Sequence, residues 1–396
     1  MNAELLAPAG TFEGLKTALL FGADAVYCGG PMLQLRAGNT SFSFEQLQKG
    51  VEYTHSLGKK LYVTVNCFAQ NDEIPLVGEY GRRLLDIGAD AAIVSDLGVL
   101  AELREKCPAL EVHISTQANT QNYKSIEMWH ALGAKRVVLG REMTMAEIEQ
   151  LKGKIPPGCE IEVFVHGAMC MAYSGRCLLS SFMNNRSGNR GQCSQPCRWN
   201  YYLVEEKRQN MFIPVIEDAG ATAVLSSTDL KAITFLDRLA DAGVTSFKIE
   251  GRMKSPYYVA TVVNAYRRYM DGTATLEQCE NELECVSHRP YASGFYFGEA
   301  KASPENDGLY RQTCSFIGIV LEEISDGTYV VEMRNRFAKG DELEILSPHS
   351  VGEKITVLGI VGEDGSEKDE AVLVQEKVTV RCGKKLFVGD MLRKRI

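Results

Sequence analysis

Four cysteines lie close together in one stretch of the sequence, and their thiols could bind a metal ion or a cluster. They are Cys170, Cys177, Cys193 and Cys197, separated by six, fifteen and three residues. Four thiolates complete the coordination of a zinc ion or of an iron–sulfur cluster. Zinc usually takes its ligands from two close Cys-x-x-Cys pairs, whereas the larger cluster accepts ligands from several backbone directions. The spacing therefore favours a 4Fe-4S cluster and leaves zinc or unligated thiols as alternatives.

Polar residues at the ends of predicted strands are candidates for catalysis. Glu250 and Arg252 follow one strand, and a carboxylate beside a guanidinium could bind an anionic small molecule or simply neutralise each other. His166 follows another strand, where it could pair with Cys170 as in a cysteine protease or form a structural hydrogen bond. We predict His166, Glu250 and Arg252 as catalytic residues.

A further set of polar residues is predicted to bind substrate. Some lie at strand ends, where carboxylates and amides also cap helices. The others are arginines beside the cysteines, which could hold phosphate groups or form a solvated face. The substrate-binding candidates are Gln117, Asn119, Arg141, Arg190 and Arg198.

Composition and charge narrow the classes of function. The formal net charge is −8 and the sequence pI is near 5.5, so a nucleic acid would have to meet a local basic surface. The sequence has no P-loop, no Gly-rich dinucleotide fingerprint, no Gly-x-Ser-x-Gly elbow and no His-Glu-x-x-His motif. Twelve cysteines, no signal-peptide pattern and no apolar run near eighteen residues predict a cytoplasmic protein without a membrane partner.

A repeating pattern predicts the fold that must position these residues. Short apolar or β-branched runs alternate with helical patterns, and several helices end at a glycine, namely Gly22, Gly88, Gly133 and Gly243. Eight such units favour a (βα)8 TIM-like barrel over residues 1–272, although a doubly wound open sheet would share much of the pattern. The predicted strands are 4–8, 25–28, 60–66, 91–95, 111–116, 136–140, 161–165 and 246–250.

The cysteines fall in a segment too long for an ordinary strand-to-helix connection. We interpret residues 167–223 as an insertion after the seventh strand, at the barrel end where active sites gather. Residues 273–313 read as a linker region that includes a short acidic helix. Alternating segments and turn signals from residue 314 to 396 predict a small C-terminal β-barrel.

Several motifs resemble one known family over nearly the whole chain. They are residues 5–10, 162–180, 227–231, 248–257 and 288–296, of which 162–180 contains the first two cysteines. The sequence is similar to the collagenase-like peptidase family, first classed as peptidases of unknown catalytic type. That resemblance implies a barrel with a C-terminal β-barrel and cluster ligands at Cys170, Cys177, Cys193 and Cys197, although some branches draw one ligand from elsewhere.

Within this family the chain most resembles the branch that hydroxylates tRNA uridine. The resemblance implies prephenate-dependent, oxygen-independent hydroxylation of C5 of the wobble uridine to 5-hydroxyuridine, with tRNA as partner and prephenate as co-substrate. Arg141 or Arg252 could bind this dicarboxylate. Sister branches imply ribosomal RNA cytidine or a quinone precursor as alternative substrates. A collagenase-like peptidase and a non-enzymatic accessory protein are the other hypotheses, and the sequence leaves the oligomeric state open.

Overall fold

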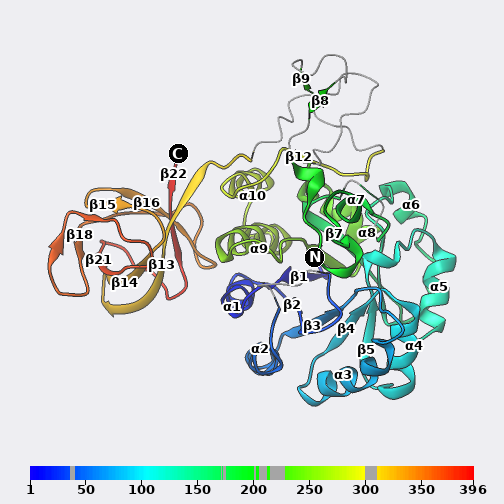
Figure 1. Cartoon of the computed structure of the whole chain (residues 1–396). Coiled ribbons are helices and arrows are strands. Elements are labelled where there is room, and N and C mark those ends of the chain that lie inside the picture. Colours follow the sequence, from blue (N-terminus) through cyan, green and yellow to red (C-terminus); the bar gives the residue numbers. More distant parts are fainter. Residues whose placement is uncertain are drawn as a thin grey trace. The chain divides into compact units, whose positions relative to one another are not determined.

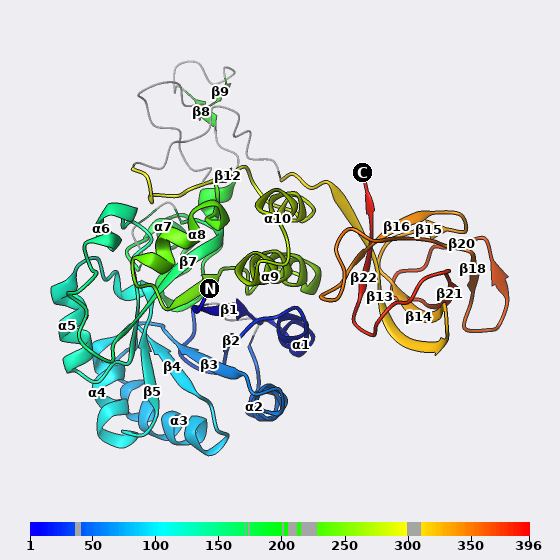
Figure 2. The same cartoon turned by 180° about the vertical axis from the view of Figure 1, so that it is seen from behind.

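In a computed structural model, the chain forms two compact units (Figures 1 and 2). The first unit comprises residues 1–15, 24–254 and 289–310, and the second comprises 16–23, 255–288 and 311–396. The structure describes residues 1–35, 41–170, 172, 175–199, 202–204, 212–214, 228–298 and 310–396, with the backbone alone of 198, 202–204 and 212–214.

Eight parallel strands in the first unit close into a barrel. Strands β1 to β7 pair in chain order, and β11 pairs with both β7 and β1, which closes the ring. All eight predicted strands and the TIM-like barrel are thereby confirmed. The strands are β1 (Glu4–Pro8), β2 (Ala25–Gly29), β3 (Lys60–Val65), β4 (Ala91–Val94), β5 (Glu111–Ile114), β6 (Arg136–Val138), β7 (Glu160–Ala168) and β11 (Ser246–Ile249).

Helices connect these strands, and their ends follow local sequence signals. Ser43 and Thr144 each begin a helix with a side chain that accepts from the third backbone N–H, in a complete capping box. Gly22, Gly88 and Gly133 have φ between 79° and 103°, the left-handed conformation in which glycine ends a helix. The helices are α1 (Phe12–Leu20), α2 (Phe44–Ser56), α3 (Ile74–Asp86), α4 (Leu97–Lys106), α5 (Tyr123–Ala131), α6 (Met145–Glu149) and α8 (Leu236–Asp241).

Strand β7 continues beyond the barrel and carries the start of the cysteine segment. Its end pairs antiparallel with β10 (Asp229–Lys231), which in turn pairs with β12 (Tyr291–Ala292). The cysteine segment, residues 170–199, holds α7 (Leu179–Asn184), η2 (Gly188–Arg190) and η3 (Pro196–Arg198). Two short strands follow, β8 (Tyr202–Val204) and β9 (Phe212–Pro214), and the rest of the predicted insertion lies outside the described residues.

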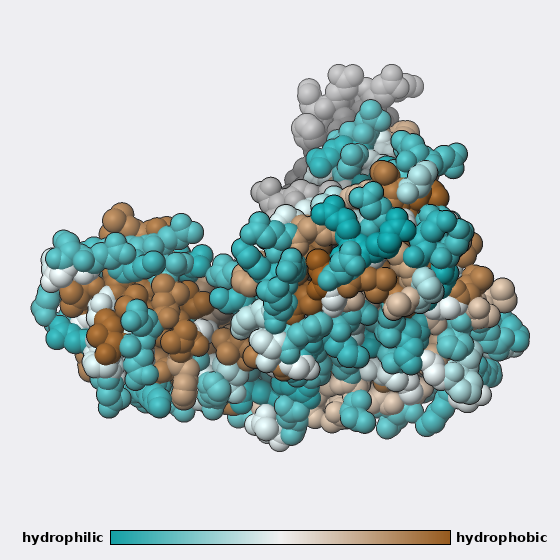
Figure 3. Space-filling model, turned by 90° about the horizontal axis from the view of Figure 1, so that it is seen from below, coloured by the Kyte–Doolittle hydropathy of each residue, from teal (hydrophilic) through white to brown (hydrophobic). Residues whose placement is uncertain are grey.

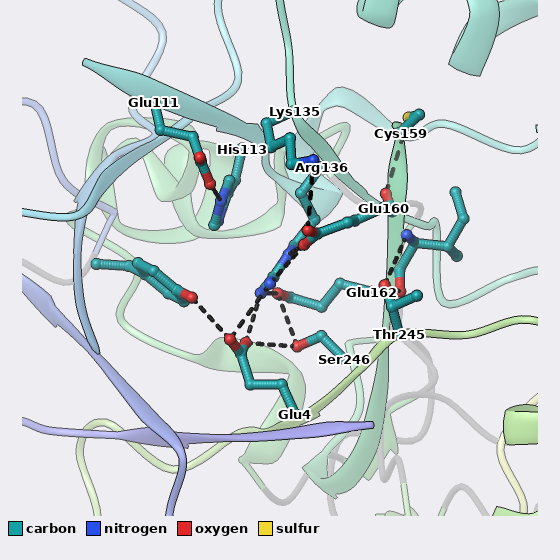
Figure 4. A network of polar contacts seen from close by, with 12 residues as sticks. Glu4, Glu111, His113, Lys135, Arg136, Cys159, Glu160, Glu162, Thr245 and Ser246 are labelled. Atoms are coloured by element: carbon teal, nitrogen blue, oxygen red, sulfur yellow. Dashed lines mark hydrogen bonds and ion pairs between the residues drawn. The ribbon is translucent and has the colours of Figure 1, made fainter. Parts of the chain in front are cut away.

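A network of buried charges fills one layer of the barrel interior (Figure 4). Glu162 on β7 is fully buried, and its carboxylate accepts from Arg136 Nη1 at 3.1 Å and from Lys248 Nζ at 2.7 Å. Arg136 also pairs with Glu4 and Glu160. Because these residues come from β1, β6, β7 and β11, the ion pairs connect the strands at which the barrel closes.

The two cations decide the charge of Glu162. Burial raises the pKa of its carboxyl, but Lys248 and Arg136 outweigh burial and lower that pKa from 4.5 to about 2. Glu162 is therefore charged at neutral pH. A buried charge held this way depends on both partners, because removing one of them leaves an uncompensated charge in a low-dielectric site.

The second unit contains two helices and a curled antiparallel sheet. Its helices are α9 (Pro256–Asp271) and α10 (Leu276–Leu283), the latter at the acidic piece of the predicted linker. The sheet has eight strands in the order β17-β16-β22-β13-β14-β21-β18-β19, and a separate ladder joins β15 to β20. These strands are β13 (Cys314–Ser325), β14 (Thr328–Met333), β15 (Phe337–Ala338), β16 (Glu342–Leu346), β17 (Lys354–Thr356), β18 (Gly359–Val361), β19 (Glu367–Lys368), β20 (Glu370–Ala371), β21 (Lys377–Arg381) and β22 (Met391–Arg395).

The sheet encloses its own hydrophobic core. Tyr329, Val331, Leu343 and Leu392 are among the fully buried side chains at its centre. The sheet agrees in class with the predicted C-terminal β domain, in the form of a curled antiparallel sheet. Other apolar side chains remain on its surface, as Figure 3 shows for one face, and they include Leu358, Val372, Leu373, Val374 and Val388. Within the described part of the chain, no helix is both long and apolar enough to cross a membrane.

We predict that Glu162→Gln destabilises the barrel by about 3–5 kcal/mol, because the two cations lose the charge that holds them. Chemical denaturation followed by circular dichroism measures this loss. Lys49→Ala, which removes an exposed helical ion pair with Glu45, should change the unfolding free energy little.

The same variant gives a pH test. Because the folded pKa of Glu162 lies below its ordinary value, the charge stabilises the fold above pH 4.5, and this contribution is lost as the pH falls toward 2. The difference in stability between wild type and Glu162→Gln should therefore shrink over that range. A constant difference would contradict the assigned role.

Candidate functional site

A polar pocket lies at the carboxyl ends of the barrel strands. It faces about 560 Å³ of space, part of which is open to solvent. Side chains on or shortly after β2, β3, β4, β5, β6, β7 and β11 converge there, as expected for a barrel of this kind. The lining residues are Tyr27, Leu35, Thr64, Asn66, Ile93, Ser115, Thr116, Gln117, Arg141, Phe164, Cys170, Lys248, Glu250 and Arg252.

Arg141 and Glu250 form a charged pair on one side of this pocket. Arg141 Nη2 lies 3.6 Å from Glu250 Oε2, and Arg141 Nη1 donates to the carbonyl of Ala168 at 2.8 Å. The guanidinium lies over the ring of Phe164, 3.8 Å from its centroid. Stacking and the backbone hydrogen bond fix the plane of the guanidinium, which is the requirement for bidentate binding of a carboxylate.

Tyr27 connects this pair to the last barrel strand. Its hydroxyl donates to the carbonyl of Ile249 at 3.0 Å and lies 3.5 Å from Glu250 Oε2. Burial, and then the charge of Glu250, raise the pKa of this phenol well above its ordinary value. Tyr27 is therefore neutral at physiological pH, and its hydroxyl is a hydrogen-bond donor positioned beside a carboxylate.

Two more cations line the pocket. Lys248 projects from β11, with its ammonium paired to Glu162 and 4.4 Å from the centroid of the Tyr27 ring. Arg252 is buried, and its Nη1 donates to Thr64 Oγ1 at 2.7 Å. With Arg141 these side chains give the lining three cations and the single carboxylate of Glu250, although the charge of Lys248 is already paired with Glu162. The pocket is therefore suited to an anionic ligand.

The backbone of β2 leaves room for Arg252. A Cβ atom at Gly29 would lie 2.7 Å from Arg252 Nη1 and closer still to the side chain of Gln34. Any larger residue at this position would displace one of these side chains. The glycine at the end of β2 is thus part of how the guanidinium is positioned.

The cysteine segment is fixed to the barrel at two points. Gly175, with φ +73°, packs so closely on the loop after β5 that a Cβ atom would lie 2.4 Å from the carbonyl oxygen of Gln117. Arg190 pairs with Glu73 at 2.9 Å and donates to the carbonyl of Phe68 at 2.8 Å. These contacts hold the segment next to the pocket that contains Gln117.

The four cysteines of this segment are not joined in disulfides. Cys170 is exposed, and Cys177, Cys193 and Cys197 are partly exposed. Their chemistry fits the ligand set of an iron–sulfur cluster, since none of these thiols is fully buried in a core or held in a disulfide. The described residues contain no group of three or more His, Cys, Asp or Glu side chains arranged to hold a metal ion. The ligand assignment therefore stays a prediction.

The structure brings some of the predicted site residues together. Gln117, Arg141, Cys170, Glu250 and Arg252 all line the pocket. They follow four separate strands, and all except Cys170, which was predicted from the cysteine spacing, were predicted from their position at a strand end. Their shared location supports the pocket as the site at which to look for catalysis.

The other predicted residues lie elsewhere. His166 is buried and packs against the ring of Tyr291, with centroids 5.4 Å apart, after a register shift between β7 and β11. Asn119 follows η1 (Thr116–Ala118) and accepts from Gln121 at 2.6 Å. Arg190 is held by Glu73. The side chain of Arg198 lies outside the described part of the chain.

Tyr27, Phe164 and Lys248 also line the pocket but were not among the predicted site residues. Lys248 stands inside an apolar strand, as does its partner Glu162. A single charge within a buried strand is a usable signal, because such a charge requires a partner in the interior. Tyr27 and Phe164 carry no comparable signal, since aromatic residues are common in strands.

Comparisons with known proteins match both units. The family model Peptidase family U32 matches residues 10–306, and the model Peptidase family U32 C-terminal domain matches residues 312–393. The tRNA hydroxylation protein P1 of Bacillus subtilis is 38% identical over 401 residues, which cover 99% of this chain and 94% of that protein. The tRNA hydroxylation protein P of Escherichia coli is 36% identical, covering 87% of this chain and 86% of that protein. A collagenase of Porphyromonas gingivalis is 36% identical and covers 98% of each chain.

The contact between Gly175 and Gln117 can be tested by substitution of the glycine. Gly175→Ala should loosen the cysteine segment, because the added methyl group meets a backbone carbonyl and the backbone is strained at positive φ. Limited proteolysis should then cleave within residues 175–199 several times faster than in wild type. Gly153→Ala is the matched control, since Gly153 has φ +76° but nothing within 4 Å of its Cβ position. Equal cleavage of both variants would refute the contact.

Proposed function

This chain belongs to peptidase family U32, and we propose that it is an RNA-modifying enzyme that hydroxylates tRNA. The proposed product is 5-hydroxyuridine at the wobble position, formed without oxygen and with prephenate as co-substrate. Two relatives that match most of the chain are named tRNA hydroxylation proteins. The observation that carries the proposal is the strand-end pocket, which combines three cations with an exposed thiol of the cysteine segment.

The cations of the pocket suit a dicarboxylate co-substrate. Arg141 has a guanidinium whose plane is already fixed, so a carboxylate could bind it through two parallel hydrogen bonds. Arg252 and Lys248 supply positive charge on the β11 side of the same pocket. A ligand with two carboxylates, such as prephenate, could place one of them on Arg141 and the other near Arg252.

A uridine base needs different partners, and the pocket also contains these. Asn66 and Gln117 carry amides that can pair with the two carbonyls and the N–H of the base. Tyr27, kept neutral beside Glu250, can donate a hydrogen bond to the base. Glu250 can accept one, since its carboxylate lies within reach of both Tyr27 and Arg141.

The cysteine segment is the proposed site of a 4Fe-4S cluster. Cys170, Cys177, Cys193 and Cys197 would hold it, and the cluster would supply electron transfer next to the pocket. Cys170 belongs to both places, because it lines the pocket and begins the segment. This shared position is what joins the proposed redox group to the proposed substrate site.

The peptidase alternative is supported by the family name and by the collagenase relative. A Cys170 and His166 pair would be its nucleophile and base. His166 packs instead against Tyr291 and is not among the lining residues. Hydroxylation of tRNA is therefore preferred over peptidase activity. Ribosomal RNA cytidine and a quinone precursor are the alternative hydroxylation substrates to test beside it.

Anaerobic purification tests the cluster. The wild-type protein should be brown and contain about four iron atoms per chain, as a 4Fe-4S cluster requires. Changing any of the four segment cysteines to alanine should remove most of the iron and the visible absorption. Cys159→Ala is the control, because Cys159 is also partly exposed but precedes β7. A colourless wild-type protein that contains zinc would exclude the cluster.

A reconstituted assay tests the activity. Wild-type protein, unmodified tRNA and prephenate should give 5-hydroxyuridine, measured by mass spectrometry of nucleosides, and omission of prephenate should abolish it. Arg141→Lys should raise the KM for prephenate about tenfold or more, since an ammonium cannot replace bidentate binding. Arg238→Lys, at an exposed ion pair with Glu149, should leave KM unchanged. An unchanged KM for Arg141→Lys would remove Arg141 from the co-substrate site.

A further inference from the structure

The cysteine segment differs from the rest of the chain in charge. Between Glu162 and Glu205 the sequence contains four arginines and no aspartate or glutamate, whereas the whole chain has a net charge of −8. Arg176 and Arg186 are exposed. Arg190 is engaged by Glu73, so it anchors the segment and is not counted as a surface cation.

Large apolar side chains are exposed on the same segment. Phe182 is 88% exposed, Leu178 is 70% exposed and Trp199 is 46% exposed. Leu178 and Phe182 are four residues apart, so they lie on one face at the start of α7. Isolated exposed apolar residues are common, but two aromatic rings among arginines without any carboxylate are a specific combination.

Hydrogen bonds hold these residues in one folded piece. Ser180 Oγ accepts from the backbone N–H of Ser194 at 3.0 Å and contacts the Ser194 hydroxyl at 3.0 Å. Asn184 Nδ2 donates to Ser194 Oγ at 2.7 Å. The stretch that leads to Trp199 is therefore attached to α7, which carries Phe182. The rings are presented by a structured surface next to the pocket.

We propose that this surface, defined by Phe182, Trp199, Arg176 and Arg186, binds unpaired nucleotides of the RNA substrate by stacking. Aromatic rings stack on bases of any sequence, and arginines hold the phosphates between them. The surface lies next to the pocket, because Gly175 packs on Gln117, a lining residue. A loop of single-stranded RNA could thus place one base in the pocket while its neighbours stack outside. The inference rests on the proposed RNA function.

Charge favours RNA over an apolar protein partner. A protein partner could bury the apolar area of Leu178 and Phe182. It would not explain why residues 163–204 contain no carboxylate. Binding of RNA phosphates explains this lack, because each carboxylate would repel a phosphate. Each arginine that contacts a phosphate also releases a counterion, which favours binding. Stacking needs a ring face, whereas a protein partner needs only apolar volume, and substitutions can separate the two.

Binding of a labelled anticodon stem–loop RNA, measured by fluorescence anisotropy under anaerobic conditions, tests the surface. Phe182→Ala and Trp199→Ala should each weaken binding about tenfold, in line with the loss of one stacked base. Phe182→Tyr should retain affinity, and Phe182→Leu should bind as weakly as Phe182→Ala. Arg176→Ala and Arg186→Ala should each reduce the dependence of log K on log salt by about 0.7.

The controls are a substitution and an RNA. Phe297→Ala removes a ring that is 56% exposed outside the segment, and it should leave affinity unchanged. A fully paired RNA duplex with the same number of nucleotides should bind wild type and Phe182→Ala alike, because its bases are paired and stacked on one another. Each variant is required to retain the iron content and visible spectrum of wild type, so that a loss of binding does not reflect unfolding.

Two results would overturn the proposal, and they differ in what they leave standing. If Phe182→Leu binds like wild type, or if all variants do while wild type hydroxylates tRNA, the stacking surface is wrong and the RNA function remains. If wild type neither binds the stem–loop nor hydroxylates tRNA, the proposed function fails together with the surface.

Discussion

The buried Glu162 carboxylate is the interaction on which the barrel and its pocket both depend. It accepts from Arg136 on one side and Lys248 on the other, in an interior where an unpaired charge would cost several kcal/mol. Its partners come from the strands that close the ring. Lys248 connects this network of buried charges to the pocket, because its ammonium pairs with Glu162 and also lies 4.4 Å from the centroid of the Tyr27 ring. The buried ion pairs of the barrel interior therefore position one of the charged residues of the pocket, Lys248.

The second constraint is the attachment of the cysteine segment beside the pocket. A chain that is acidic overall concentrates arginines without carboxylates in this one segment, and close packing at Gly175 sets it against Gln117. Cys170 belongs to both the segment and the pocket. A redox group held here would lie where a base entering the pocket could be modified, and the same geometry gives an acidic protein a local surface for a polyanion.

Much of the barrel could be predicted because its signals are local. Alternating strands and helices, and the left-handed glycines Gly22, Gly88 and Gly133, follow from short stretches of sequence. The pocket residues Gln117, Arg141, Glu250 and Arg252 followed from one rule, that parallel strands present their carboxyl ends at the same edge. The lone charge of Lys248 in an apolar strand indicates a buried partner, but the identity of that partner could not be derived without knowing which strands face each other across the closed ring.

His166 shows a limit of the same rule. It ends a barrel strand and should have pointed toward the pocket, but the register shift against β11 intervenes and the side chain packs on Tyr291. A register shift depends on the partner strand, so the sequence of β7 alone does not reveal it. In the same way, the pairing of Arg190 with Glu73 joins residues 117 positions apart and left no local trace. The predicted and observed sites therefore differ where contacts between distant parts of the sequence decide the position of a side chain.

The central claim, that this pocket and its thiols modify tRNA, is tested most directly in cells. Nucleosides of total tRNA and ribosomal RNA are compared by mass spectrometry between a deletion strain and strains that carry wild type or Cys170→Ala. The account predicts loss of 5-hydroxyuridine and its derivatives from tRNA, restored by wild type alone. Unchanged tRNA in the deletion strain would contradict it, and a simultaneous loss of hydroxycytidine from ribosomal RNA would assign the pocket to that substrate instead.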